Sequence, residues 1–397
     1  MKKIFVFVAF AVLGTVSAQA QSYYQDSKNS EMLRHADRHE TCRREMVLPQ
    51  VNGYNVYKAD LHTHTIFSDG QVLPSLRVQE AWLDGLDIMA VTEHIEHRPT
   101  EATFVEYLGK YVDEKYDGAV NHKIGSKGMT EEGLMVDLNH CVKLSQKEAE
   151  KYGLLIIPGA EITRSGSKVG HFNALFTTDN NLIYDPDPVQ AIRNAKAQGA
   201  LVQHNHPGWR RENLNFTEAE EIAYNDGLID GVEVMNSGEF YPVIVDRVQK
   251  YGQFIAANSD VHSTTAIGYT LYGSNRPMTL VFAADKTLEA VREALEAGRT
   301  LAIGFNTRGG GEQLLKDFFA AGVKVSVIRK DGDNIDLAVT NMTSIPYTIK
   351  KGSSNQRKLD AFSTIKISVS KKAKTLDLTV LNMFCGKDAH PVVKLTF

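Results

Sequence analysis

Hydrophobic positions between residues 57 and 303 form short apolar runs that alternate with longer amphipathic segments. Eight runs predict strands, at 57–62, 88–92, 154–161, 172–176, 200–203, 231–235, 254–257 and 279–282. Between them, 74–85, 188–199 and 288–298 predict helices that stop at glycines. This alternation favours an α/β fold, a closed (β/α) barrel over residues 51–305, with an open doubly wound sheet as the alternative.

A different pattern follows residue 306. Short alternating runs at 323–329, 335–340, 347–350, 364–370, 376–381 and 392–397 are separated by turn signals. They predict a small all-β, sandwich-like domain over 306–397, whose sequence has no aromatic ladder or basic stripe to indicate a partner. Residues 100–152 are too many for one strand–helix connection, so we expect an insertion with a helix or two that helps shape a substrate pocket.

The N-terminus has the features of an export signal. Lys2 and Lys3 precede a short apolar run, and small residues lie at Ala18 and Ala20. This pattern predicts a signal peptide over residues 1–20, cleaved near Ala20/Gln21, and a polar extension over 21–50. The apolar run is shorter than the roughly 20 residues that span a bilayer. We therefore expect a periplasmic or secreted protein without a stable membrane anchor.

The composition argues against two other classes of protein, general nucleic-acid binders and cysteine-based metal or disulfide proteins. The 44 basic and 48 acidic residues give a net charge of -4, which opposes general binding of a nucleic-acid polymer. Cys42, Cys141 and Cys385 allow one disulfide at most and lack the spacing of a zinc ribbon. Any metal chemistry must therefore use other ligands, and the 13 histidines are the first candidates. The oligomeric state stays open.

The segment Asp-Leu-His-Thr-His contains the first candidate pair. His62 and His64 are two residues apart on a predicted strand, so both rings can face one ion. Other predicted strand ends carry further His, Asp or Glu residues: Asp69, His94, Glu161, His171, His206, Asp260 and His262. Imidazole and carboxylate ligands without thiolates suit Zn, Mn or Fe.

This ordered set resembles the PHP family, the polymerase and histidinol phosphatase phosphoesterases, over residues 58–303. The resemblance implies a distorted (β/α)7 TIM-like barrel, the PHP fold, with three divalent metal ions. It implies that His62, His64, Glu161 and Asp260 hold the first ion, Glu161, His171 and His206 the second, and Asp69, His94 and His262 the third. Export together with an added β domain is similar to a subgroup that contains phosphodiesterases.

The expected activity is hydrolysis of a small-molecule phosphate ester, either a phosphomonoester or a phosphodiester. Hydroxide generated at the first two ions, which Glu161 bridges, would attack phosphorus, while the third ion would bind a phosphoryl oxygen. Three divalent ions, three carboxylates and one hydroxide leave about +2 facing the substrate, which suits a phosphate ester better than a neutral amide.

Several neighbouring residues are weaker candidates. His204 would share a face with His206 if the strand continues, so it is a candidate proton donor to the leaving group or a support for the ligands. Arg164 and Arg210 are candidates to bind phosphate oxygens, with solvated surface positions as the alternative. Asn236, with Glu239 nearby, is a candidate substrate contact.

Asp60 and Glu93 flank ligands and are candidates to orient the imidazoles, although the family more often has Asp at the position of Glu93. His97, His122 and His140 are candidates for the pocket wall, with surface placement as the alternative.

Two other functions compete with phosphate ester hydrolysis. Amidohydrolase barrels, which hydrolyse amides or lactones, also begin with His-x-His, but they typically use a bridging lysine where Glu161 is expected here. A non-catalytic metal-binding or glycan-binding module is the third alternative.

Overall fold

The computed structural model describes residues 24–26, 28–35, 43–101, 103, 120–122, 134–164 and 168–397. The predicted signal peptide and Cys42 lie outside these residues. Arg43–Phe397 form one compact unit, and Met1–Cys42 form another, in which β1 (Tyr24–Asp26) pairs with β2 (Leu33–His35). None of the described helices is long and apolar enough to cross a membrane.

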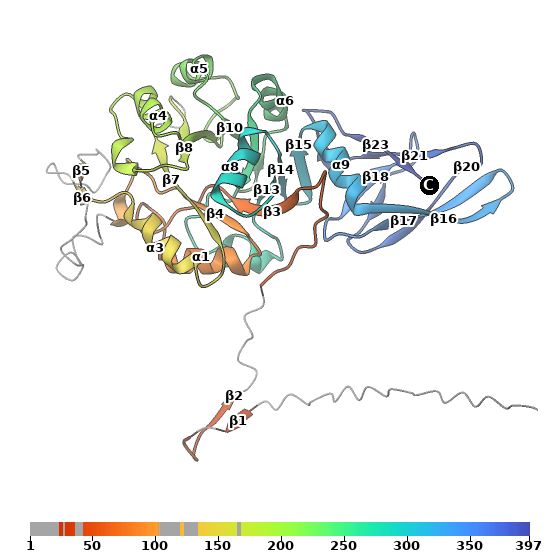
Figure 1. Cartoon of the computed structure of the whole chain (residues 1–397), viewed down its shortest axis with the longest axis horizontal. Helices are drawn as coiled ribbons and strands as arrows, with labels where there is room; N and C mark the ends of the chain where they lie inside the picture. The colour runs from red at the N-terminus through yellow and green to blue at the C-terminus, as the bar shows by residue number, and fades with distance from the viewer. Residues whose placement is uncertain are drawn as a thin grey trace, which may run out of the picture. The chain divides into compact units, whose positions relative to one another are not determined.

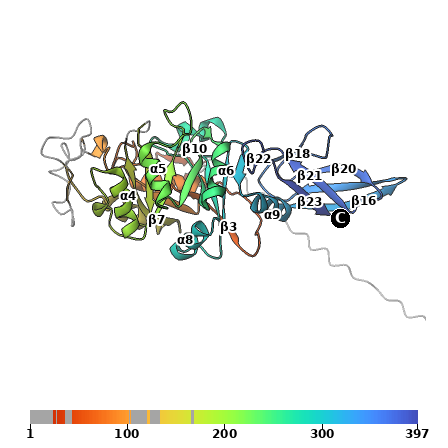
Figure 2. The ribbon, with the colours of Figure 1, turned by 90° about the horizontal axis from the view of Figure 1, so that it is seen from above.

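A large curled sheet forms the centre of the unit Arg43–Phe397 (Figures 1 and 2). Its barrel-like part consists of β3 (Asn55–Asp60), β4 (Ile88–Val91), β7 (Leu155–Thr163), β8 (His171–Leu175), β9 (Leu201–Asn205), β10 (Gly231–Asn236) and β12 (Phe254–Asn258). β3, β4 and β7 are parallel neighbours, as are β9, β10 and β12. Beyond the ends of β3 and β12, Thr63 pairs with Val261. The predicted α/β class is confirmed.

β8 departs from a regular strand–helix repeat. It pairs antiparallel with both β7 and β9, and it follows β7 as a hairpin. The structure therefore does not confirm a count of seven strand–helix units. All eight strands predicted for the barrel region are present, with ends shifted by a few residues.

Helices cover the outer face of this sheet (Figure 1). They are α1 (Pro74–Leu83), α3 (His140–Ala149), α4 (Pro188–Ala197), α5 (Glu218–Asn225), α6 (Pro242–Tyr251) and α8 (Leu288–Glu296), with the short α7 (Thr265–Gly268), η1 (Asn180–Leu182) and η2 (Thr270–Tyr272). Proline begins α1, α4 and α6, where its missing N–H costs nothing. Thr217 and Glu220 form a capping box on α5.

The predicted insertion contains α3 and the hairpin of β5 (Val120–His122) and β6 (Leu134–Val136). Residues 104–119 and 123–133 lie outside the described residues, as does the side chain of His122. A role of this insertion in the pocket stays a prediction.

The sheet continues past β3 through antiparallel strands to the C-terminal part. These are β13 (Met278–Ala283), β14 (Thr300–Gly304) and β15 (Thr307–Gly310), and β11 (Glu239–Phe240) pairs with β10 at the other end. The boundary predicted near residue 306 falls inside the β14–β15 hairpin. β15 then pairs with β22 (Met383–Phe384), so strands from both sides of that boundary share one sheet.

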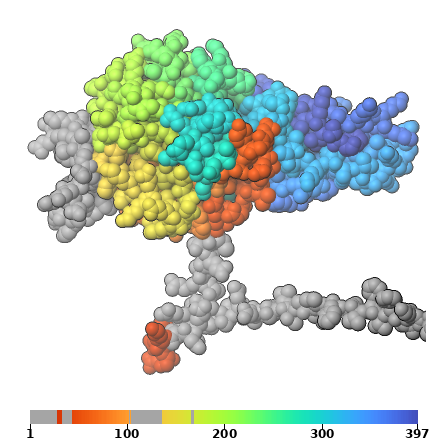
Figure 3. Space-filling view, in the orientation of Figure 1, coloured from red at the N-terminus to blue at the C-terminus, as the bar shows by residue number. Residues whose placement is uncertain are grey.

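Two small sheets follow the helix α9 (Glu312–Gly322). One has the order β16 (Val323–Asp331), β17 (Asn334–Asn341), β20 (Thr364–Ser370), and the other β19 (Arg357–Leu359), β18 (Tyr347–Lys350), β21 (Thr375–Val380), β23 (Val392–Thr396). Phe318 and Phe319 of α9 belong to a hydrophobic cluster that also includes Leu280 of β13 and Leu378 of β21. The C-terminal part, blue in Figure 3, thus shares its core with the large sheet.

Candidate metal centre

Histidine and carboxylate side chains from several strands meet at one edge of the curled sheet. His62 and His64 follow β3, and Asp260 and His262 follow β12. A hydrogen bond from Asp260 N to His62 O (3.0 Å) links the two segments. Because β8 runs antiparallel, its first residue, His171, reaches the edge where the parallel strands end. This edge therefore gathers side chains that are far apart in the sequence.

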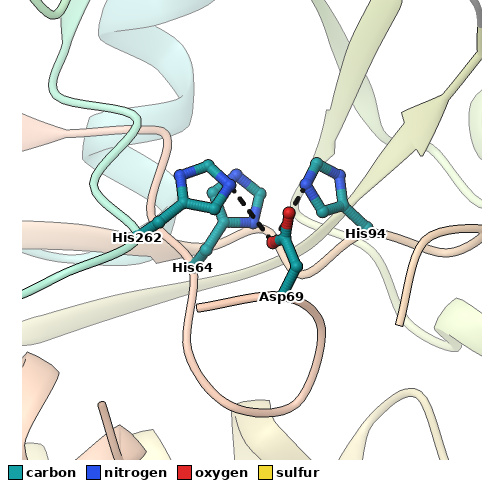
Figure 4. A group of neighbouring side chains, drawn as sticks. All are labelled: His64, Asp69, His94 and His262. Atoms are coloured by element: carbon teal, nitrogen blue, oxygen red, sulfur yellow. Dashed lines mark ion pairs between the residues drawn. The ribbon is translucent and has the colours of Figure 1, made fainter. Parts of the chain in front are cut away.

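One donor group consists of His64, Asp69, His94 and His262, whose ligand atoms lie within 4.8 Å of one another (Figure 4). Asp69 Oδ1 is 3.3 Å from His94 Nε2 and 3.1 Å from His262 Nε2. The ring of His64 stacks against both other rings, with centroids 4.2 and 4.3 Å away. These residues include the three that were predicted for the third metal, with His64 added.

Glu161 is fully buried at the middle of the site. Its Oε1 is 3.4 Å from His62 Nε2, 3.3 Å from His171 Nδ1 and 3.7 Å from His206 Nε2. Its Oε2 lies 2.5 Å from His94 Nδ1 on the other side. One carboxylate thus faces imidazoles on both sides, which is the arrangement that a bridging ligand requires.

Three further donor groups are His62–His64–Glu161, His62–His206–Asp260 and Glu161–His171–His206. The last group coincides with the set predicted for the second metal. The set predicted for the first metal is divided between the other two, although Asp260 Oδ1 lies 3.3 Å from His62 Nε2 and 3.2 Å from His64 Nε2. All nine predicted ligands belong to these four groups, and no other side chain in the described part of the chain does.

The backbone turns sharply at two of these residues. His206 has a φ of 24° and Asp260 a φ of 51°, in the left-handed region that residues other than glycine seldom adopt. Each such conformation costs about 1–3 kcal/mol and persists only where the surroundings hold it. At His206, the backbone N–H donates to Glu233 Oε2 (2.7 Å). The turn directs the His206 ring toward Glu161 where β9 ends.

Glu233 connects several of these segments and is fully buried in β10. Its Oε1 accepts hydrogen bonds from His62 Nδ1 (2.9 Å) and Asn258 Nδ2 (2.8 Å), and its Oε2 accepts one from Asn236 Nδ2 (2.8 Å). The bond at Nδ1 leaves His62 Nε2 facing the centre. Sequence reasoning assigned Glu233 no role, although a carboxylate inside an apolar strand was a usable signal.

Asp60 and Glu93 were candidates to orient the imidazoles, and the structure contradicts this. Asp60 pairs with the buried Arg276 (3.1 Å) and accepts a hydrogen bond from the backbone N–H of His62 (3.3 Å). Glu93 accepts hydrogen bonds from groups of the loop after β3. Neighbouring side chains of an extended segment point to opposite sides, so Glu93 points away from the ring of His94. Both carboxylates hold the backbone that carries the ligands.

His204 lies behind the centre, which contradicts its predicted role as a proton donor to the leaving group. Its ring is fully buried, with Nδ1 3.0 Å from Tyr224 Oη and Nε2 2.8 Å from Glu220 Oε1. Asn205 faces the centre instead, and its amide donates to the Glu161 carboxylate (2.9 Å). The expected alternation from His204 to His206 fails because the chain turns at His206.

Arg77 of α1 links two of the ligand segments from outside the site. It is fully buried, and its guanidinium donates to His64 O (3.0 Å), His262 O (3.2 Å) and Ser263 O (2.9 Å). Glu80, one turn later, pairs with Arg77 at 2.7 Å. The first helix therefore fixes the spacing between the segments that follow β3 and β12.

Opposite charges gathered at the site shift its pKa values in both directions. Burial, together with neighbouring His94 and His262, lowers the pKa of His64 to about 4. Burial also opposes the charge on His94, but the carboxylates of Glu161 and Asp69 outweigh it and raise the pKa to about 10. The imidazoles overcome burial and hold the pKa of Asp69 and Glu161 well below the usual range. Divalent cations would compete with these protons, because metal ligands must be deprotonated.

Several atoms that could bind a metal ion are buried in the site without a hydrogen-bond partner among the described residues. They are His62 Nε2, His64 Nδ1 and Nε2, His171 Nδ1 and Asp69 Oδ1. Buried polar atoms are normally hydrogen-bonded, so five atoms at one site that have close neighbours of the site but no hydrogen bond require an explanation. Divalent metal ions would supply it, and a set of six imidazoles and three carboxylates fits Zn, Mn or Fe.

A cavity of about 840 Å³ opens onto the centre, and Arg164, Arg210 and Asn236 line it. Arg164 is held in place by an ion pair with Glu96 and by hydrogen bonds to Thr163 O (3.1 Å) and Asp185 O (2.6 Å). These contacts engage both terminal nitrogens of the guanidinium and pair its charge with Glu96, at a position that lines the cavity.

Other residues of the cavity wall include Trp209, Glu239 and His97. The exposed Arg210 lies over the Trp209 ring, 4.2 Å from its centroid. His97 Nε2 is 3.6 Å from Asp69 Oδ2. His140 lies beside Phe67 and is not among the residues that line the cavity.

A curled α/β sheet with clustered imidazoles and carboxylates at its strand ends is typical of metal-dependent hydrolases. No family model and no curated protein matches the chain. Among solved structures, it is similar to a two-domain protein from Bacteroides vulgatus that contains a predicted PHP-like metal-dependent phosphoesterase. The two are 30% identical, with 89% of this chain and 99% of the other covered and a TM-score of 0.76.

That similarity extends over nearly the whole length of both chains, and we conclude that this protein belongs to the PHP family. Two more distant structures also match. One is a proposed metal-dependent phosphoesterase from Bifidobacterium adolescentis, with 16% identity, coverage of 52% of this chain and 88% of that chain, and a TM-score of 0.36. The other is a lesion-specific endonuclease from Pyrococcus furiosus, with 15% identity, coverage of 70% of this chain and 64% of that chain, and a TM-score of 0.37. They are too distant to inform function.

Proposed function

We propose that the protein hydrolyses phosphate esters of small molecules with three divalent metal ions held by the nine predicted ligands. The observation that carries the proposal is the convergence of those nine residues in four adjoining groups, with six of the nine lining one cavity. The PHP-like relative from Bacteroides vulgatus supports the same class of reaction.

The chain would contribute ligands, orientation and positive charge. Bound metal ions lower the pKa of a bound water and polarise a phosphoryl oxygen. Glu161 would lie between ions because its two oxygens face different groups of imidazoles. Glu233 would keep the Nε2 atom of His62 directed inward. Arg164, with Arg210 at the rim, would bind the remaining phosphate oxygens.

The cavity has room for more than a phosphate group. Its volume of about 840 Å³ lies in the range of pockets that enclose whole small-molecule ligands. The space suits either a monoester with a bulky leaving group or a diester. The wall contains no lysine among the described residues, so nothing in it provides the lysine bridge of an amidohydrolase.

Rates on matched aryl phosphate monoesters and diesters would test the proposal, after reconstitution with Mn, Zn or Fe and measurement of bound metal. We expect hydrolysis that a chelator abolishes and added metal restores, with a preference that identifies the ester class. Metal-loaded, folded protein that hydrolyses neither ester would contradict the proposal. Turnover of a matched aryl amide alone would favour the amidohydrolase function.

We also propose export, from the signal-peptide pattern of residues 1–20. The expected product begins near Gln21 and lies outside the cytoplasm. N-terminal sequencing of protein from cell fractions tests this directly, and full-length protein confined to the cytoplasm would contradict it.

A further inference from the structure

The C-terminal sheets carry a strong positive charge that the whole-chain total conceals. Residues 323–397 contain 13 lysines and arginines against six acidic residues, a formal charge of +7. Residues 1–322 contain 31 basic and 42 acidic residues, a charge of -11. Nothing in the proposed reaction uses the positive charge of this part, which suggests a separate binding role.

Much of this charge gathers where the edges of the two small sheets face each other. β20 is the edge strand of one sheet and β19 the edge strand of the other. Arg357 Nη1 of β19 donates to Lys366 O of β20 (2.5 Å), and Lys351 Nζ donates to Ser368 O (2.7 Å). We call the exposed cations along these edges and the turn after β20 the basic edge: Lys351, Arg357, Lys358, Lys366, Lys371, Lys372 and Lys374.

Carboxylates neutralise little of the basic edge. Lys366 pairs with Asp336 at 3.4 Å, an ion pair that Arg329 shares. The other six cations have no carboxylate oxygen within 4.0 Å in the described part of the chain. By contrast, Arg292 and Arg299 near the large sheet each pair with a glutamate. Unpaired cations on one edge create a field that attracts a polyanion.

A small cavity lies within the same edge. Its volume is about 300 Å³, and Ile349, Ile367 and Leu378 form an apolar floor. Lys351 and Arg357 line it, together with polar groups of Ser354, Asn355 and Ser368. The site therefore combines an apolar surface, two cations and several neutral hydrogen-bonding groups.

We propose that the basic edge binds an acidic polysaccharide, a glycan that carries repeated carboxylate or sulfate groups. The two cations match the anionic groups, the serine and asparagine side chains match sugar hydroxyls, and the apolar floor matches the C–H face of a sugar ring. This binding is independent of the metal centre and does not rest on the proposed hydrolysis.

The same residues favour a glycan over a membrane or a nucleic acid. Residues 351–358 and 366–374 contain no aromatic side chain, and their large apolar side chains are buried. Peripheral membrane binding uses apolar side chains that enter the bilayer, and single-stranded nucleic acids stack on aromatic rings. Neither feature is present among the residues that carry these cations, and the exposed Phe362 lies beyond them, in the turn that joins β19 to β20.

Binding of the full-length mature protein to immobilised dextran sulfate, compared with neutral dextran in the presence of a chelator, tests the proposal. We expect binding only to the sulfated polymer, weakening with salt. Lys371→Glu/Lys372→Glu should lower the affinity at least about tenfold, because it reverses two charges that contact the polyanion. Lys351→Gln/Arg357→Gln tests the cavity itself, with thermal unfolding as a check of folding.

Lys324→Glu/Lys394→Glu is the matched control, because it makes the same charge change on β16 and β23, the opposite edges of the two sheets. We expect it to change the affinity less than about threefold. Equal losses in the two charge-reversal variants would overturn the basic edge as the site. Absence of binding to dextran sulfate, or tighter binding to anionic phospholipid vesicles or double-stranded DNA, would overturn the choice of partner.

Discussion

At the scale of single residues, the ligand set depends on carboxylates that never face the cavity. Glu233 accepts a hydrogen bond from the ring of His62 and another from the backbone of His206, so one buried side chain orients two candidate ligands. Such outer partners fix the direction of the ring nitrogen that binds the metal. Loss of this support should therefore change both metal affinity and the rate of hydrolysis.

Glu233→Gln should lower metal affinity or activity by about 10–100-fold, because the amide is a weaker acceptor for His62 Nδ1 and leaves that ring less firmly oriented. Metal content after dialysis and the rate on an aryl phosphate measure the effect. Glu289→Gln on the exposed face of α8 is the control, with no expected loss. Unchanged metal binding in the Glu233 variant would show that His62 needs no such support.

His204→Leu separates a structural role from a catalytic one. The substitution removes the contacts with Tyr224 and Glu220 and should destabilise the protein by about 1–3 kcal/mol, the cost of unpaired buried groups. We expect the rate of the folded variant on an aryl phosphate to stay within about threefold of the wild type, since His204 does not face the cavity. A rate loss that an activated leaving group rescues would instead identify a proton donor.

At the scale of elements, one carboxylate joins a strand, a loop and a helix behind the site. Glu220 of α5 accepts hydrogen bonds from Arg211 (2.6 and 2.9 Å) and Thr217 N (2.8 Å), and it lies 2.8 Å from His204 of β9. The loop held in this way carries Trp209 at the cavity wall. Burial disfavours the charge on Glu220, but these partners outweigh it and lower its pKa to about 2.

This shift predicts a pH-dependent contribution to stability. Because the pKa of Glu220 is lower in the folded state, its contribution is fully present above the unfolded value near 4.5 and is lost as the pH falls toward about 2. Glu220→Gln should lower the free energy of unfolding by roughly 2 kcal/mol at pH 7 and reduce its slope between pH 4.5 and 2. Urea unfolding at several pH values measures both, and a parallel slope in the variant would contradict the assignment.

At the scale of the whole molecule, the C-terminal part completes the core of the large sheet. β22 pairs with β15, and α9 packs Leu315, Phe318 and Phe319 into a cluster with residues of both parts. Fully buried aromatic side chains contribute about 3–5 kcal/mol each when truncation to alanine is measured. The two parts therefore depend on each other for stability.

Deletion of all residues after 306 should unfold or aggregate the remaining chain, because it removes β15 and exposes the apolar face that α9 covers. Circular dichroism and size-exclusion chromatography measure this outcome. A soluble fragment with the thermal midpoint of the full-length protein would show that the large sheet folds without its C-terminal partner.

The sequence alone determined the nine candidate ligands and the strands that carry them. Histidines and carboxylates at the ends of apolar runs can bind metal ions because of their residue type, whichever strands pair in the sheet. His62 and His64 share a face because they are two residues apart on an extended segment. Tertiary structure decided the rest, because contacts between distant segments and single backbone turns leave no periodic signal. The turn at His206 removed His204 from the centre, and the fold placed Glu233 against His62. The facing edges of β19 and β20 brought the cations of residues 351–358 beside those of residues 366–374.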